Sequence, residues 1–144
     1  MSEICPLCQE DGGLAVYREP LLRVVRVLDT PAHPAFYRVV LNRHVAEFSQ
    51  LPVGERMRLM EVVAQVEALL LRELQPVKLN LASLGNVVPH LHWHVVARFA
   101  DDAQFPAPIW ANAVREREPA ALAELAGRLP AMDRLLAQAL GEST

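Results

Sequence analysis

The chain has 144 residues, which is long enough for one domain with a hydrophobic core and too short for two comfortable ones. Apolar residues make up 52% of it and charged residues 22%, and the net charge of −3 provides neither a basic surface for nucleic acid nor an acidic tail. No apolar run reaches membrane-spanning length and the start of the chain lacks a signal-peptide pattern, so we expect a cytoplasmic protein that binds neither membrane nor nucleic acid.

The only two cysteines, Cys5 and Cys8, lie in the sequence CPLC near the N-terminus. Such a pair forms either a redox centre or half of a metal site. A redox motif needs a preceding strand and a following helix, whereas the turn-forming sequence QEDGG follows here. A reducing cytoplasm also disfavours a stable disulfide, so the redox interpretation is weakened.

Extended structure is expected on both sides of a break at TPAHP, residues 30–34. Residues 14–29 predict one or two short strands with a β-branched run at 22–28. Residues 35–45 resume the extended pattern, in which alternate side chains face opposite sides of a sheet. One face is expected to carry Tyr37, Val39 and Leu41, and the other Phe36, Arg38 and Val40.

The region 52–74 predicts one long helix, which Pro76 ends. Its apolar residues recur at three- and four-residue spacing, with charged and polar residues between them. The recurring apolar residues are Leu59, Met60, Val63, Val66, Leu70 and Leu74.

Residues 78–99 predict two strands joined by a tight turn at Gly85-Asn86. The composition of 101–112 is that of a loop, and the C-terminal region has two helical stretches that Pro130 separates or kinks. The order of strands, helix, strands and helix indicates an α+β fold with a largely antiparallel sheet.

The sequence PHLHWHVV places His90, His92 and His94 at alternate positions, which predicts that they share one face of a strand. A solvated face would normally carry Lys, Glu, Thr or Ser instead. Alternate imidazoles can chelate zinc if their rings converge. A neutral imidazole can also attack phosphorus when its other ring nitrogen holds a proton against a fixed acceptor such as a carbonyl. We favour phosphoryl or nucleotidyl chemistry over metal binding.

The stretch from His90 to Val96 matches the H-φ-H-φ-H-φ-φ signature of the histidine triad family of nucleotide hydrolases and transferases. Gly85-Asn86 stands where that family commonly has Gly-Gln, and the resemblance covers about residues 5–99. The longer sequence LNLASLGNVVPHLHWHVVARF resembles the bacterial, diadenosine tetraphosphate hydrolase-like branch. The resemblance implies an antiparallel sheet of about five strands in a single domain, residues 1–144, with a core at 1–100 and a helical extension at 101–144. It also implies a nucleotide substrate and a homodimer with sheets joined edge to edge.

A two-step reaction without a required cofactor is also implied by the resemblance. His92 would attack the α-phosphate of a nucleotide and form a nucleotidyl-imidazole intermediate, which water then hydrolyses. The main-chain carbonyl of His90 would fix the tautomer of His92. His94 would contact the phosphate and help the leaving group to depart.

Four further residues match positions of phosphate or ribose contacts in the family. Asn80 would lie near the phosphate, and the Gly85-Asn86 turn would place donors along it. Asp29 matches the acidic ligand of the ribose hydroxyls. An equally strong interpretation of Asp29 is a turn-starting residue before TPAHP.

The chain departs from the family pattern near these positions. Val87 stands where many members have a serine or threonine, which leaves the rate and the preferred leaving group open. Ala35-Phe36 replaces the usual Gly-His, and Asn42-Arg43 replaces Pro-Lys. Two hypotheses therefore stand beside each other: a nucleotide hydrolase or transferase, and a nucleotide-binding or adaptor protein with little or no turnover.

Some relatives, including galactose-1-phosphate uridylyltransferase, hold one zinc ion with an N-terminal C-x-x-C, a histidine before the long helix, and the first triad histidine. Cys5, Cys8, His44 and His90 match that set, which would form a closed, structural Cys₂His₂ site. The alternative is a pair of reduced, partly buried thiols with His44 hydrogen-bonded at a strand end.

Four other side chains receive provisional placements. His33 is expected at the surface or at a dimer edge, and Trp93 on the strand face that points away from the histidines toward the helix. Trp110 would cover the nucleotide base or pack across a subunit interface. Arg98 is expected to be a surface charge rather than a polyphosphate contact.

Overall fold

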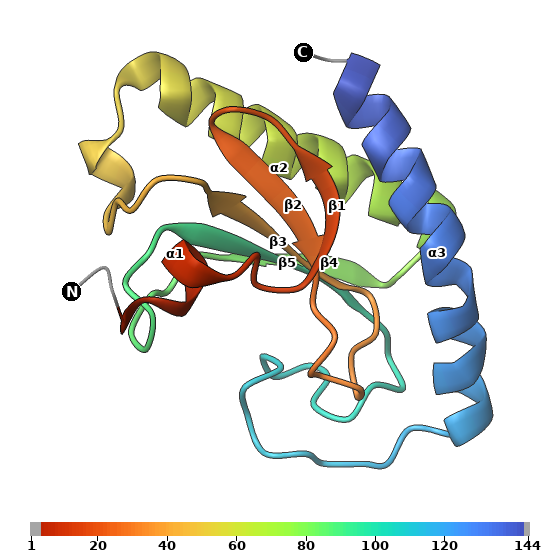
Figure 1. Ribbon diagram of the computed structural model, residues 1–144. Helices are drawn as coiled ribbons and strands as arrows, with labels where there is room; N and C mark the ends of the chain where they lie inside the picture. The colour runs from red at the N-terminus through yellow and green to blue at the C-terminus, as the bar shows by residue number, and fades with distance from the viewer. Residues whose placement is uncertain (1–3, 143–144) are drawn as a thin grey trace.

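The computed structural model describes residues 4–142 and has one five-stranded antiparallel sheet in the order β1-β2-β3-β5-β4 (Figure 1). The strands are β1 (Leu14–Arg18), β2 (Leu22–Arg26), β3 (Phe36–Leu41), β4 (Lys78–Ala82) and β5 (His92–Arg98). The helices are α1 (Pro6–Gln9), the 3₁₀ turn η2 (Phe48–Gln50), α2 (Val53–Leu74) and α3 (Pro119–Glu142). The predicted α+β fold with an antiparallel sheet, a long helix and a C-terminal helix is confirmed.

Helix α2 confirms the helix expected at 52–74 to within one residue. Its apolar residues fall on one face that packs on the sheet. Burial of this face therefore stabilises the helix more than its intrinsic helix propensity does. It ends where Gln75 takes a left-handed conformation, with φ of 50°, and Pro76 follows. The buried residues are Leu59, Val62, Val63, Val66, Leu70 and Leu74.

Helix α3 is continuous over 24 residues, so the expectation that Pro130 separates two helical stretches is wrong, while a kink at Pro130 stays a prediction. Pro130 lies within the helix on its exposed side. There, the carbonyl that loses its N–H partner can bond to water, while the buried stripe on the opposite side runs uninterrupted. That stripe consists of Leu125, Leu129, Met132, Leu136 and Leu140.

The two faces of the sheet are used differently. Tyr37, Val39 and Leu41 join the main core with α2 and α3, as the alternation predicts. On the second face, Val40 packs with Cys5 and Leu7 of the N-terminal segment, and Phe36 packs with Ile109 of the long loop before α3. The N-terminal segment therefore covers one part of the second face and the long loop covers another. His92 and His94 of β5 lie between these two parts.

The connection from β4 to β5 is longer than expected. Residues 83–91 form it, so the tight two-residue turn at Gly85-Asn86 is wrong, although Gly85 does take a left-handed φ of 76°. β5 begins only at His92, because the backbone N–H groups of His90 and Leu91 bond to Val88 and Val45 and not to a neighbouring strand. His90 thus lies before the strand. Within residues 4–142, no helix combines the length and apolar character needed to cross a bilayer.

Candidate active site

Two of the three triad histidines lie side by side on the second face of the sheet. His92 and His94 are opposite Val40 and Arg38 of β3, and both are buried. Their ring centroids are 4.8 Å apart and the rings are nearly perpendicular, at 84°. The third, His90, is fully buried beside them in the loop that leads into β5.

The tautomer of His92 is fixed by the main chain. Its Nδ1 lies 2.5 Å from the carbonyl oxygen of His90, so Nδ1 carries the proton and Nε2 keeps its lone pair. Burial, helped by the nearby Arg38 charge, lowers the pKa of His92 although the bond to His90 raises it. Near pH 7 this ring is uncharged, and within residues 4–142 its Nε2 has no hydrogen-bond partner.

His94 is held neutral still more strongly. Burial, and then the neighbouring His92 and Arg38, lower the pKa of His94 to about 3. Its Nδ1 is buried with no hydrogen-bond partner in the described part of the chain. The ring meets Phe36 and Trp110 edge to face, with centroids 5.4 and 5.2 Å away. His94 can thus donate or accept a hydrogen bond, but its imidazole is not protonated to the cation at neutral pH.

A cavity of about 340 Å³ opens beside His92. Its walls come from the N-terminal segment, including Gly12 and Gly13, and from Asp29 and Arg38. Asp29 and His92, which are 63 positions apart in the sequence, thus share one cavity. The Asp29 carboxylate also accepts a hydrogen bond from Thr30 Oγ1 at 3.2 Å, so the turn-starting interpretation stands beside the ribose-binding one.

Arg38 is a cation at this site that the sequence analysis did not assign to it. Its guanidinium is half-buried, its Nη1 donates to the carbonyl oxygen of Gly12 at 3.1 Å, and its Nε is buried without a partner among the described residues. No carboxylate within residues 4–142 forms an ion pair with it. The available signal was a charged residue amid FYRVVL, at the strand position that faces the histidines.

Cys5, Cys8, His44 and His90 come together and could bind a metal ion. The Sγ atoms of Cys5 and Cys8 each lie 3.5 Å from Nδ1 of His90, and Cys8 Sγ lies 3.2 Å from Nδ1 of His44. Tetrahedral zinc places sulfur and nitrogen ligands about 3.5 Å apart, so the set fits. His90 Nε2 donates to the carbonyl of Leu41 at 2.7 Å, which leaves the Nδ1 lone pair facing the sulfur atoms.

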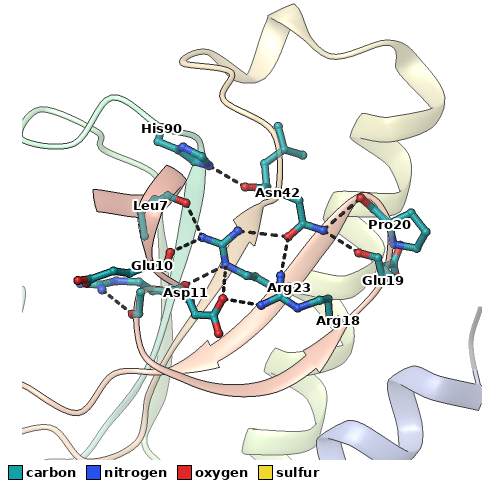
Figure 2. Close-up of polar contacts among 12 residues, drawn as sticks. Leu7, Glu10, Asp11, Arg18, Glu19, Pro20, Arg23, Asn42 and His90 are labelled. Atoms are coloured by element: carbon teal, nitrogen blue, oxygen red, sulfur yellow. Dashed lines mark hydrogen bonds and ion pairs between the residues drawn. The ribbon is translucent and has the colours of Figure 1, made fainter. Parts of the chain in front are cut away.

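Arg23 fastens the cysteine segment to the sheet (Figure 2). Its buried guanidinium donates to the carbonyl oxygens of Leu7, Glu10 and Asp11 at 2.7 to 3.0 Å, and to Asn42 Oδ1 at 3.2 Å. The single side chain of Arg23 in β2 therefore provides the hydrogen-bond donors for three backbone carbonyls of residues 7–11. Sequence periodicity gave no indication of this contact.

Three residues expected at the phosphate lie apart from the cavity beside His92. Asn80 faces a second cavity with Trp110, and its Oδ1 accepts a hydrogen bond from Arg98 at 2.8 Å. Of the β4–β5 loop, Val88 rather than Gly85 or Asn86 lines the cavity beside His92. Phosphate binding by Asn80, Gly85 and Asn86 stays a prediction.

Two placements from the sequence are wrong. Arg98 is only 1% exposed, because its guanidinium forms an ion pair with the fully buried Asp102 at 2.8 Å. His33 is 4% exposed and its Nε2 is 2.6 Å from Gln104 Oε1. Trp93 does face the main core, where its ring meets Phe48. The partners of Arg98 and His33, Asp102 and Gln104, both lie in the long loop before α3. The sequence of that loop has no periodic pattern that predicts these contacts.

Comparison with known protein families gives one match, in which the HIT domain model covers residues 10–101. The chain belongs to the histidine triad family. This membership agrees with the His92 and His94 geometry, and it makes the chain one of the nucleotide-binding hydrolases and transferases. The comparison with curated proteins gives no match.

Solved histidine triad structures share the fold. A histidine triad protein from Bradyrhizobium japonicum is 29% identical, with a TM-score of 0.70 over 86% of this chain and 90% of that one. One from Sinorhizobium meliloti is 26% identical, with a TM-score of 0.65 over 83% and 89%. A Zn-bound histidine triad family protein from Mycobacterium smegmatis is 18% identical, with a TM-score of 0.61 over the full length of both chains.

Proposed function

We propose that the protein cleaves a phosphoanhydride or phosphoramidate bond at the α-phosphate of a nucleotide through a covalent intermediate on His92. One observation carries the proposal: an uncharged His92 whose Nδ1 is occupied by the His90 carbonyl and whose Nε2 has no partner in the described chain, next to a 340 Å³ cavity. Cavities of this size hold small-molecule ligands. Arg38 and Asp29, in the same cavity, suit a phosphate and a ribose.

The bonds change in two steps. The Nε2 lone pair of His92 forms a bond to the α-phosphorus, while the bond from phosphorus to the leaving group breaks and the leaving group takes its electron pair. A phosphate departs as an anion, whereas an amine also takes a proton from solvent as it departs. A water oxygen then bonds to the phosphorus, the phosphorus–nitrogen bond breaks back onto Nε2, and the proton of water passes to solvent. Arg38 would stabilise the charge on the phosphate oxygens during both steps.

We further propose that Cys5, Cys8, His44 and His90 hold a structural zinc ion. Zinc there would supply a crosslink between the N-terminal segment, the end of β3 and the loop before β5. All four ligand positions would be filled by side chains, so the metal would take no part in the reaction.

The diadenosine tetraphosphate hydrolase-like branch and a homodimer are also proposed on the resemblance alone. The sheet has open edges at β1 and β4, either of which can pair with a second copy. A cytoplasmic location stays an expectation from the sequence.

A nucleotide-binding or adaptor role is the second candidate. Val87, at the position where many relatives carry a hydroxyl, is 93% exposed and offers the phosphate no side-chain donor. Such a protein would bind nucleotides in the same cavity without turning them over.

Turnover of an adenosine phosphoramidate and of diadenosine tetraphosphate tests the proposal. We expect His92→Asn to lower kcat at least about 1,000-fold, because it removes the nucleophile, and a nucleotidyl group to be trapped on His92 of the wild-type protein by rapid quenching and mass spectrometry. His33→Gln, which lies outside the site, serves as the control and should retain activity. Turnover that survives in His92→Asn would refute the nucleophile, and binding without turnover in the wild type would favour the adaptor role.

A further inference from the structure

A second cavity, of about 580 Å³, lies on the other side of the histidines from the first. Its walls are β4 from Lys78 to Ala82, Leu84 of the following connection, and three residues of the long loop, Pro106, Pro108 and Trp110. The first cavity adjoins β2 and β3, whereas this one adjoins β4, and β5 with its histidines lies between them. The two cavities therefore flank His92 and His94.

His94 and Trp110 mark the boundary between the reacting centre and the second cavity. Trp110 meets the His94 ring at 5.2 Å while remaining 53% exposed. Ala82, which also lines the cavity, pairs directly with His94 across the β4–β5 ladder. Trp110 and Ala82 thus connect the second cavity to His94.

The loop that carries Trp110 is held by a buried ion pair. The Asp102 carboxylate accepts from Arg98 and from the backbone N–H groups of Gln104 and Phe105, and Arg98 also donates to the carbonyl of Ala107 at 2.7 Å. Arg115 donates to the carbonyls of Asp102 and Phe105. These bonds place Trp110 before any ligand arrives, which lowers the entropy lost on binding.

Polar donors line the cavity beside the indole. The Oδ1 of Asn80 is engaged by Arg98, so the amide nitrogen of Asn80 is directed elsewhere, and it has no partner within residues 4–142. Lys78, at the start of the same strand, donates one ammonium N–H to the carbonyl of Leu79 at 2.8 Å and has two further donors. An aromatic surface with an amide donor and an ammonium suits a ligand that joins a planar ring to negative charge.

We infer that this cavity is a leaving-group subsite in which Trp110 stacks on an aromatic base carried by an anionic, phosphate-linked leaving group. The inference rests on the proposed function, and it makes Trp110 a specificity-determining residue. The cavity is larger than the one beside His92, so it has room for a second nucleoside with its phosphates, whereas a small amine would leave most of it empty.

The protonation state of His94 agrees with this choice. A phosphate leaving group departs as an anion with the electron pair of the broken bond and needs no proton, whereas an amine does. Because the pKa of His94 is lowered to about 3, the ring offers a hydrogen bond and not a proton at neutral pH.

Binding to the His92→Asn protein tests the subsite without requiring turnover. Two ligands with equal numbers of phosphates are compared by calorimetry: diadenosine tetraphosphate, and adenosine 5′-tetraphosphate, which lacks the second adenosine. We expect about tenfold tighter binding of the first, from stacking of one base. Adding Trp110→Ala should remove that preference, and Trp110→Phe should restore most of it. Val114→Ala, at an exposed position of the same loop, is the matched control.

The outcomes separate the two proposals. If binding prefers diadenosine tetraphosphate in a way that depends on Trp110, but the wild-type protein shows no turnover, the hydrolytic function is refuted and the subsite is supported. Equal affinities for the two ligands, or a preference that survives Trp110→Ala, would overturn the subsite even if His92 proves to be the nucleophile. If the wild-type protein is active, its kcat/KM for diadenosine tetraphosphate divided by its kcat/KM for adenosine 5′-tetraphosphate should fall about tenfold on Trp110→Ala.

Discussion

At the residue scale, Asp102 shows how a buried charge organises a loop. Its side chain is fully buried, and burial alone would oppose ionisation of the carboxyl group. Hydrogen bonds from Arg98, and from the backbone N–H groups of Phe99 and Phe105, outweigh burial and lower the pKa of Asp102 to about 2. The free energy of unfolding should therefore depend on pH through this residue.

Because the pKa of Asp102 is lower in the folded chain than the ordinary value of 3.8, its ionised form stabilises the protein above about pH 4. That stabilisation is lost as the pH falls toward 2. We expect the difference in free energy of unfolding between wild type and Asp102→Asn to shrink by ~2 kcal/mol between pH 7 and pH 2. Denaturant titrations at several pH values measure it.

The neighbouring residue provides the control for this measurement. Asp101 forms an ion pair with Arg117 at 3.2 Å, but its side chain is 58% exposed. Asp101→Asn should change the free energy of unfolding by less than about 1 kcal/mol at any of these pH values. If Asp102→Asn behaves like Asp101→Asn, the buried pair does not hold the loop.

Residue roles were predictable where a short motif carried them. The Cys5 and Cys8 pair and the alternating histidines indicate a site from the sequence alone, and the four metal-ligand candidates do converge. Arg98 was misplaced because its exposure depends on Asp102, and the loop between them gives no periodic signal. Burial of a charge is decided by a partner, which a single strand pattern does not reveal.

At the element scale, Arg23 joins α1 and the following turn to β2. Replacing it with methionine leaves the buried carbonyl of Leu7 and the partly buried carbonyls of Glu10 and Asp11 without their donor. We expect Arg23→Met to raise amide hydrogen exchange over residues 7–13 by at least about tenfold and to lower the bound zinc below one equivalent. Exchange mass spectrometry and elemental analysis measure the two effects.

Arg18→Met is the matched change on the neighbouring strand. Arg18 pairs with the carboxylate of Asp11, but both side chains are about half exposed. Its removal should leave exchange and zinc content near the wild-type values. If wild-type protein purified without a chelator or a His tag contains no zinc, the metal proposal is refuted.

Elements were predictable in proportion to the length of their pattern. The 22-residue helix α2 has an apolar stripe over its whole length and begins and ends almost as expected. The sequence predicts a tight turn where the structure has a nine-residue connection at 83–91, since Gly85-Asn86 favours a turn wherever it lies within a loop. Pro130 does not divide α3, since it lies on the exposed side and leaves the buried apolar stripe continuous.

At the scale of the whole molecule, α3 ties the C-terminal extension to the sheet. Asp133 of α3 accepts hydrogen bonds from the Tyr37 hydroxyl at 2.7 Å and from Arg26 Nε at 3.0 Å, so the helix is bound to β3 and β2. Burial, together with the bond to Asp133, raises the pKa of Tyr37. The extension is thus part of the main core, whereas its sequence predicted only that it is helical.

Two adjacent leucines of α3 test this attachment. Leu136 is fully buried, whereas Leu135 is 37% exposed. Leu136→Ala should lower the free energy of unfolding by about 2–5 kcal/mol, and Leu135→Ala by less than about 1 kcal/mol. Equal effects in thermal or denaturant unfolding would mean that α3 does not contribute its buried stripe to the core.

One residue, His90, serves two neighbours with different parts of its structure. Its imidazole faces the thiols, while its peptide oxygen receives the Nδ1 proton of His92. Since every amino acid has that oxygen, losing the imidazole need not free the His92 ring. A descendant could therefore discard the entire thiol–imidazole cluster, provided other packing holds the loop, and inherit a working nucleophile.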